Sequence, residues 1–101
     1  MDNRFKLQTA LEWVLGTRQV YFQKPTSVLM QYPAIVYTRS RIAGEHADNM
    51  LYFGRLGYTV TLIDKNPDSL YFDKLVAFPF SQFDRQYAID NLNHFVFTIY
   101  F

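Results

Sequence analysis

The sequence predicts an α+β domain, with a mostly antiparallel or mixed sheet of about five strands and two helices in the order α-β-β-β-α-β-β. Apolar residues alternate through Tyr58–Asp64 and again through Phe95–Phe101, which is typical of strands. The first segment instead has a helical spacing. Its apolar residues fall at i, i+3, i+4 and i+7, namely Leu7, Ala10, Leu11 and Val14.

Length and composition indicate a single domain over residues 1–101. Half of the 101 residues are apolar, which is enough for a packed core. The formal net charge is +1 without a run of like charges, so we expect no basic stripe for nucleic acid. The chain has no cysteine, which excludes disulfides and thiolate metal sites. No apolar run reaches the ~20 residues that span a bilayer, and no signal peptide is expected.

The first helix is expected over residues 3–15, with Asp2 or Asn3 as its cap and Gly16 as its end. Leu15 widens its apolar stripe. Trp13 lies off that stripe, which leaves two interpretations. It is either a residue at the rim of the core or a docking residue for a neighbouring chain.

Two strands are expected next, at Arg18–Gln23 and Ala34–Ile42. The far end of the second is polar on both faces. A polar projecting loop or hairpin is therefore predicted over about 38–57, with a sharp change of direction at Gly54 and Gly57.

The second half of the chain predicts a strand, a helix and a hairpin. Asn66 caps a helix over 67–78 that begins with Pro67. The strand at 81–89 and the strand at 95–101 are joined by a turn at 90–93. Within the first of these strands, strict alternation assigns one face to Ser81, Phe83, Arg85, Tyr87 and Ile89.

Candidate chemistry is sparse, so we predict no enzyme, no cofactor and no metal. His46 lies in a polar loop without a second ligand nearby, and His94 is expected to have a hydrogen-bonded structural role. Asp64 and Asp68 flank the expected helix start, where capping explains Asp68. The four glycines are scattered and form no phosphate loop. With 19% aromatic residues, a protein-binding role is what remains.

Charged residues near the polar segment suggest a subunit contact. Arg39 and Arg41 are two apart on a strand and therefore share a face. Glu45 and Asp48 follow in the loop. We hypothesise that these four residues, with Trp13, contact a neighbouring subunit or partner; the alternative is that they are solvated.

Several segments of this chain resemble the small tail-terminator proteins (minor tail or head–tail joining proteins) of long-tailed bacteriophages. The resemblance covers most of the chain in matching order, and its segments are Tyr21–Pro25, Met30–Tyr37, Tyr58–Ser69, Phe83–Tyr87 and Asp90–His94.

The resemblance implies a structural virion protein at the head-proximal end of the tail, assembled in the host cytoplasm. Tail terminators form a six-membered ring that caps the tail tube and joins it to the head connector. The implied partners are other copies of the chain, the tube protein and a connector or stopper protein. The resemblance also implies that genome DNA passes through the lumen of the ring without specific binding. Alternatives are another head–tail completion or stopper protein, or a non-viral protein-binding module.

Overall fold

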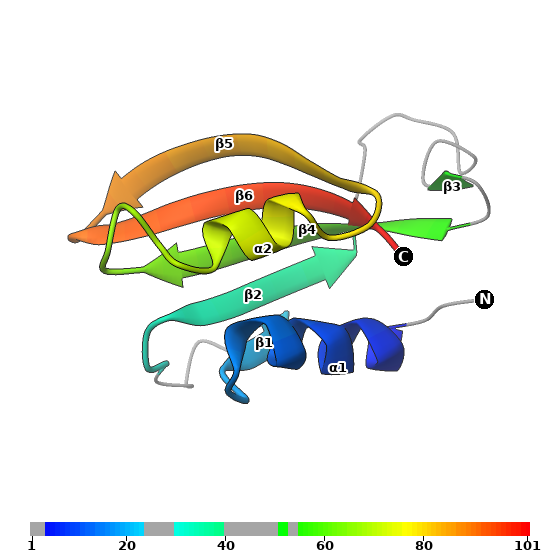
Figure 1. The fold of residues 1–101 in the computed structure, drawn as a ribbon, viewed down its shortest axis with the longest axis horizontal. Helices are drawn as coiled ribbons and strands as arrows, with labels where there is room; N and C mark the ends of the chain where they lie inside the picture. Colours follow the sequence, from blue (N-terminus) through cyan, green and yellow to red (C-terminus); the bar gives the residue numbers. More distant parts are fainter. Residues whose placement is uncertain (1–3, 24–29, 40–50, 53–54) are drawn as a thin grey trace.

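The computed structural model describes residues 4–23, 30–39, 51–52 and 55–101 (Figure 1). Two helices lie in front of a curved sheet in this view. The elements, in chain order, are α1 (Arg4–Leu15), β1 (Val20–Phe22), β2 (Ala34–Arg39), β3 (Leu51–Tyr52), β4 (Arg55–Asp64), α2 (Phe72–Val76), β5 (Ser81–Ile89) and β6 (Leu92–Tyr100).

The main path of the sheet has the strand order β1-β2-β4-β6-β5. β1 and β2 pair in parallel, and the other neighbours pair antiparallel, so the sheet is mixed. The two-residue strand β3 lies off this path and pairs with the start of β4. The predicted α+β class, with five main strands and two helices, is confirmed. β5 and β1 form the two edges of this path.

The core lies between one face of the sheet and the two helices. Alternate residues of β4, namely Tyr58, Val60 and Leu62, are fully buried. Val60 and Leu62 pair with Tyr37 and Ile35 of β2, and all three pair with Ile99, Phe97 and Phe95 of β6. These apolar side chains belong to one buried cluster with leucines of both helices. Those leucines are Leu7, Leu11, Leu15 and Leu75. Both helices therefore cover the same face, here called the helix face, and the other is called the open face.

α1 agrees with the prediction, and Gln8 adds hydrogen bonds to the sheet beside the packed leucines. The Gln8 amide donates to the carbonyl of Val20 over 2.9 Å, and its oxygen accepts from the Tyr37 hydroxyl over 2.5 Å. Gly16 ends the helix in the left-handed region, at φ 77°, and its N–H donates to the Glu12 carbonyl. The predicted caps Asp2 and Asn3 lie outside the described residues.

The second helix is much shorter than predicted. It begins at Phe72, not at Pro67, and has no side-chain cap. The Asn66 side chain does accept a backbone N–H, that of Asp68 at 2.9 Å, but in a turn. Asp64 accepts from Asn66 in the same way, and Ser69 from Tyr71. These bonds to the residue two positions on compete with a helix, so the capping roles predicted for Asn66 and Asp68 are wrong.

A β-bulge overturns the predicted face of β5. Phe83 pairs with Phe97 and Arg85 with Val96, so Asp84 is the extra residue. Ser81 and Phe83 therefore lie on the helix face, whereas Arg85, Tyr87 and Ile89 lie on the open face. The hairpin turn is also shorter than predicted. It consists of Asp90 and Asn91, both at positive φ, as a two-residue turn of type I′ requires.

The projecting loop or hairpin predicted over about 38–57 is wrong at both of its ends, where the chain is in strands. Thr38 and Arg39 belong to β2, and residues 55–57 belong to β4. Gly57 is buried and pairs with Tyr100 in the ladder, so it makes no turn. Gly54 and the centre of the segment lie outside the described residues.

Truncating the core leucines tests this packing. Leu11→Ala and Leu75→Ala each remove a fully buried side chain and should lower the free energy of unfolding by about 2–5 kcal/mol. Leu70→Ala is the matched control, because Leu70 is 79% exposed; its effect should stay within about 0.5 kcal/mol. Urea unfolding followed by circular dichroism measures all three. Equal stabilities for the three variants would contradict the assignment.

Candidate interaction surfaces

α1 presents an exposed apolar stripe on the side away from the sheet. Phe5 is 74% exposed and Trp13 is 83% exposed. They are eight residues apart, with Thr9 between them at the i, i+4 spacing, so the three share one side of the helix. We call Phe5, Thr9 and Trp13 the α1 stripe. The interpretation of Trp13 as a core-rim residue is therefore wrong.

Arg39 lies at the opposite end of α1 from Trp13. Its guanidinium is 5.1 Å from the centroid of the Phe22 ring, and that of Arg4 is 4.4 Å from the same ring. Trp13 follows Arg4 by nine residues, about 13 Å along the helix. The structure does not bring Trp13 and Arg39 together. Arg41, Glu45 and Asp48 lie outside the described residues, so the contact hypothesised for them stays a prediction.

The second surface is the outer edge of β5, which the sequence analysis missed. Eight of its nine residues are exposed, and no described strand pairs with its outer side. Phe83 and Tyr87 are each about two-fifths exposed and Ile89 more than half. We call Ser81–Ile89 the β5 edge. Its signal in the sequence was the polar run Asp84-Arg85-Gln86, since charged residues are typical of edge strands.

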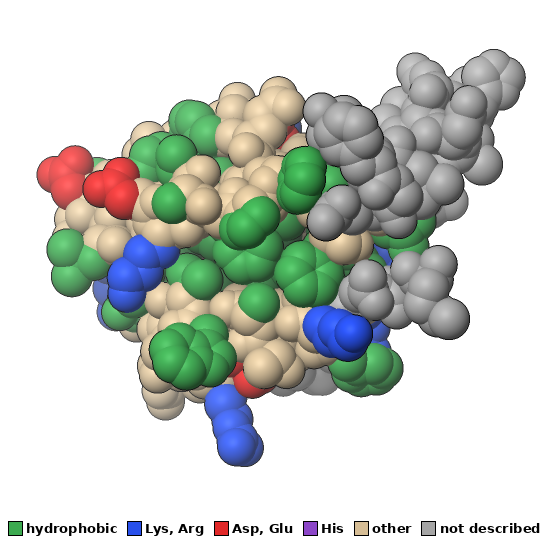
Figure 2. All heavy atoms as spheres, turned by 45° about the vertical axis from the view of Figure 1, so that its right-hand side comes forward, with side chains coloured by type: hydrophobic (Ala, Val, Ile, Leu, Met, Phe, Trp, Pro, Cys, Tyr) green, Lys and Arg blue, Asp and Glu red, His purple; other side chains and the backbone are tan. Residues whose placement is uncertain are grey.

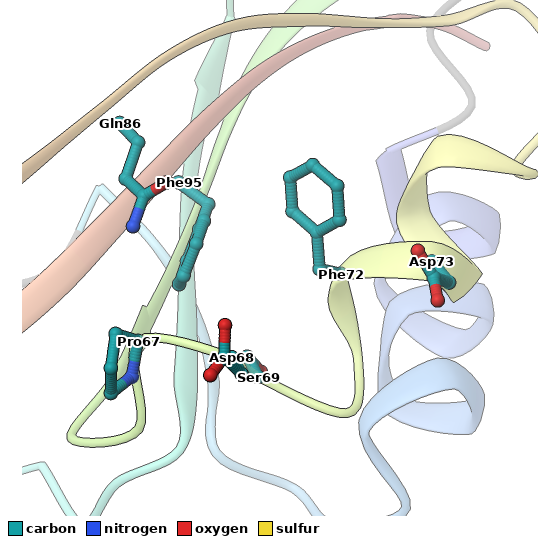
Figure 3. Close-up of a pocket in the computed structure, with 7 residues that line it drawn as sticks. All are labelled: Pro67, Asp68, Ser69, Phe72, Asp73, Gln86 and Phe95. Carbon is teal, nitrogen blue, oxygen red and sulfur yellow. The ribbon is translucent and has the colours of Figure 1, made fainter.

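A hollow of about 320 Å³ lies between the β5–β6 hairpin and the segment that leads into α2 (Figure 3). The rings of Phe72 and Phe95 form its apolar part, with centroids 5.5 Å apart. Gln86 enters from the β5 edge, and the turn contributes Pro67, Asp68 and Ser69. The Ser69 hydroxyl accepts a backbone hydrogen bond, and no histidine, lysine or arginine lines the hollow. Its geometry suits an apolar side chain with a polar rim.

His94 has the structural environment that the sequence predicted. Its ring stacks on that of Tyr87 at 4.7 Å and 9°, and its Nδ1 is 3.2 Å from the Leu92 carbonyl oxygen. His46 lies outside the described residues. In the part of the chain that the structure describes, no three His, Cys, Asp or Glu side chains gather as a metal site. No helix there is long and apolar enough to cross a membrane.

The face of the molecule shown in Figure 2 carries many apolar side chains with charges scattered between them. Lys and Arg side chains lie apart on this face and form no stripe. The fold and its surfaces thus define a small α+β domain with two exposed candidate surfaces, the α1 stripe and the β5 edge. No family model, curated protein or solved structure matches this chain.

The α1 stripe should contribute little to the stability of the fold. Phe5→Ala and Trp13→Ala remove side chains that are mostly in water, so each should change the free energy of unfolding by less than about 1 kcal/mol. Chemical denaturation provides the measurement. A loss above about 2 kcal/mol for Trp13→Ala would mean that this ring is part of the core.

Proposed function

We propose that this chain is a structural subunit of a bacteriophage virion, a tail terminator that forms a ring at the head-proximal end of the tail tube. It acts through contacts with copies of itself, with the tube and with the head connector, and it catalyses no reaction. Its exposed residues form the contacts of the assembled virion.

The α1 stripe carries this proposal. A large aromatic ring that is 83% exposed gains no free energy from its own fold, whereas burial in a contact would be favourable. Trp is enriched where proteins meet, near the centre of contacts. α1 packs on β1 and β2, at the edge of the sheet that is farthest from β5. A ring subunit needs such a surface for an unlike surface of its neighbour.

The resemblance supplies the particular kind of assembly. The segment Tyr58–Ser69 runs through the central strand β4 and its following turn, and Phe83–His94 runs from the β5 edge into β6. These segments form the framework of the sheet. The proposal takes the tail-terminator assembly from this resemblance and the contact surface from the exposure of the α1 stripe.

Deletion of the gene in the phage that encodes this chain tests the proposed function. A tail terminator stops tube growth and permits head joining. Virions without it should therefore have tails of irregular length, separate from heads, in electron micrographs. Purified protein added with tubes should form rings at their ends, of about the sixfold symmetry that the family implies. Normal tails on joined heads in the deletion strain would contradict the proposal.

Trp13→Ala should impair assembly without unfolding the subunit. Loss of a central aromatic contact costs about 2 kcal/mol or more in many interfaces, and a ring repeats that loss at every contact. The variant should give few complete tails in a complementation assay. Leu70→Ala is the matched control, because Leu70 is equally exposed but lies before α2. Full complementation by Trp13→Ala would remove the α1 stripe from the contact.

A further inference from the structure

The β5 edge has a charged centre, and its outer side pairs with no strand among the described residues. Its nine residues are long enough for a ladder of hydrogen bonds with another strand. Asp84 and Arg85, adjacent and of opposite charge, lie at its centre. A strand with this arrangement can be complementary to itself when the second copy runs antiparallel.

Because of the bulge, residues at equal distances on either side of the Asp84–Arg85 bond lie on the same face of β5. Phe83 and Gln86 pair with Phe97 and Phe95, whose side chains belong to the core, so both lie on the helix face. Between them, Asp84 and Arg85 both lie on the open face. The Asp84 carboxylate accepts from Thr98 at 2.6 Å, and Arg85 pairs with Val96. Thr98 and Val96 alternate with Phe95, Phe97 and Ile99, the residues of β6 that belong to the core cluster under the helices.

The same symmetry continues outward along the strand. Gln82 and Tyr87 lie on the open face, opposite Thr98 and His94. Ser81 and Ala88 lie on the helix face, opposite Ile99 and Asn93. Without the bulge, strict alternation would place residues at equal distances on either side of the Asp84–Arg85 bond on opposite faces of the sheet. If two antiparallel copies of β5 are centred between Asp84 and Arg85, the two side chains of every opposed pair therefore lie on the same face.

We propose that two copies of this chain pair through their β5 edges, antiparallel, around a twofold axis between Asp84 and Arg85. Asp84 of each copy lies opposite Arg85 of the other, so the contact contains this charge pair twice. Gln82 lies opposite Tyr87, and Phe83 opposite Gln86. Directly opposite side chains in such a ladder have Cβ atoms about 5 Å apart, which brings the charged pairs within reach.

The hollow beside β5 adds an apolar element to this contact. Gln86 lines the hollow, and Phe83 of the second copy lies directly opposite Gln86 in this register. Phe83 is 40% exposed in the single chain, so its outer part is available for burial at the hollow's rim. Each copy covers the other's hollow, as an isologous contact requires.

This dimer goes beyond the proposed function and does not depend on it. An isologous contact closes on itself, whereas a ring needs contacts between unlike surfaces. The α1 stripe lies beyond the opposite edge of the sheet and stays accessible in the dimer. We infer that the pairing covers the β5 edge in the free protein, before any assembly.

Charge reversal and its rescue test the contact. Asp84→Arg places an arginine opposite the second copy's Arg85, on both sides of the twofold axis. Arg85→Asp likewise places an aspartate opposite the second copy's Asp84. Each should weaken dimerisation about tenfold or more, because attraction becomes repulsion at two places. The double variant Asp84→Arg/Arg85→Asp restores complementarity and should return to near the wild-type dissociation constant. Arg18→Asp, at the far edge, is the control.

Sedimentation equilibrium at low salt gives the dissociation constants, and thermal melts confirm that each variant folds. The dimer should weaken as salt rises, since the charge pairs are near the surface. A wild-type chain that stays monomeric at about 100 μM, or a double variant no better than the single ones, would overturn the proposal. Neither outcome bears on tail assembly, which the deletion experiment tests separately.

The natural absence of cysteine permits a test of register. Gln82→Cys and Tyr87→Cys each introduce one thiol at positions that lie opposite each other only between copies. A mixture of the two variants should form a disulfide-linked heterodimer under mild oxidation, because paired strand positions approach disulfide geometry. Either variant alone should link poorly, since its own two thiols are several residues apart along the ladder. Equal linking in all three samples would exclude this register.

Discussion

The structure depends on burying one face of the sheet under two helices of unequal length. The central strand β4 supplies Tyr58, Val60 and Leu62 to that face, and it is paired on both sides by β2 and β6. α1 covers one side of this layer with three buried leucines, whereas α2 has five residues and contributes Leu75. Apolar burial of this kind is the largest favourable term in folding.

α2 is short because of the turns that precede it. Side-chain bonds of Asp64, Asn66 and Ser69 hold the preceding segment in turns, so the helix begins late. It packs Phe72 against Phe83, Phe95 and Phe97, and no described element pairs with the outer side of β5. Local turn chemistry therefore limits α2 to one side of the helix face, whereas the strand order places β5 at the edge of the described sheet, opposite the stripe on α1.

Much of the fold could be predicted from periodicity, because the strongest patterns lie in the buried elements. The alternation in Tyr58–Asp64 and Phe95–Phe101 and the spacing of Leu7 and Leu11 all correspond to buried faces. Two errors came from local features. A bulge at Asp84 leaves no mark in residue type, so strict alternation assigned Arg85 to the wrong face. Asn66 followed by Pro67 suits both a helix start and a turn, and the turn formed.

The contact surfaces were less predictable, because exposure depends on what the rest of the fold covers. Trp13 was a candidate from its place off the apolar stripe, and its exposure supports a contact role. The β5 edge could not be identified without the strand order, since an edge strand is defined by its missing neighbour. Its self-complementary charges became meaningful only when the bulge placed Asp84 and Arg85 on the same face.

Residue-resolved amide hydrogen exchange by NMR, at low and high protein concentration, tests the central claim that the β5 edge is a contact surface. In dilute protein, backbone amides on the outer side of β5 should exchange quickly, because no described strand pairs with that side, while those of β4 stay protected. As concentration rises, protection should appear in β5 and remain unchanged along α1. Fast exchange in β5 at every concentration, or protection already complete in dilute protein, would contradict the account.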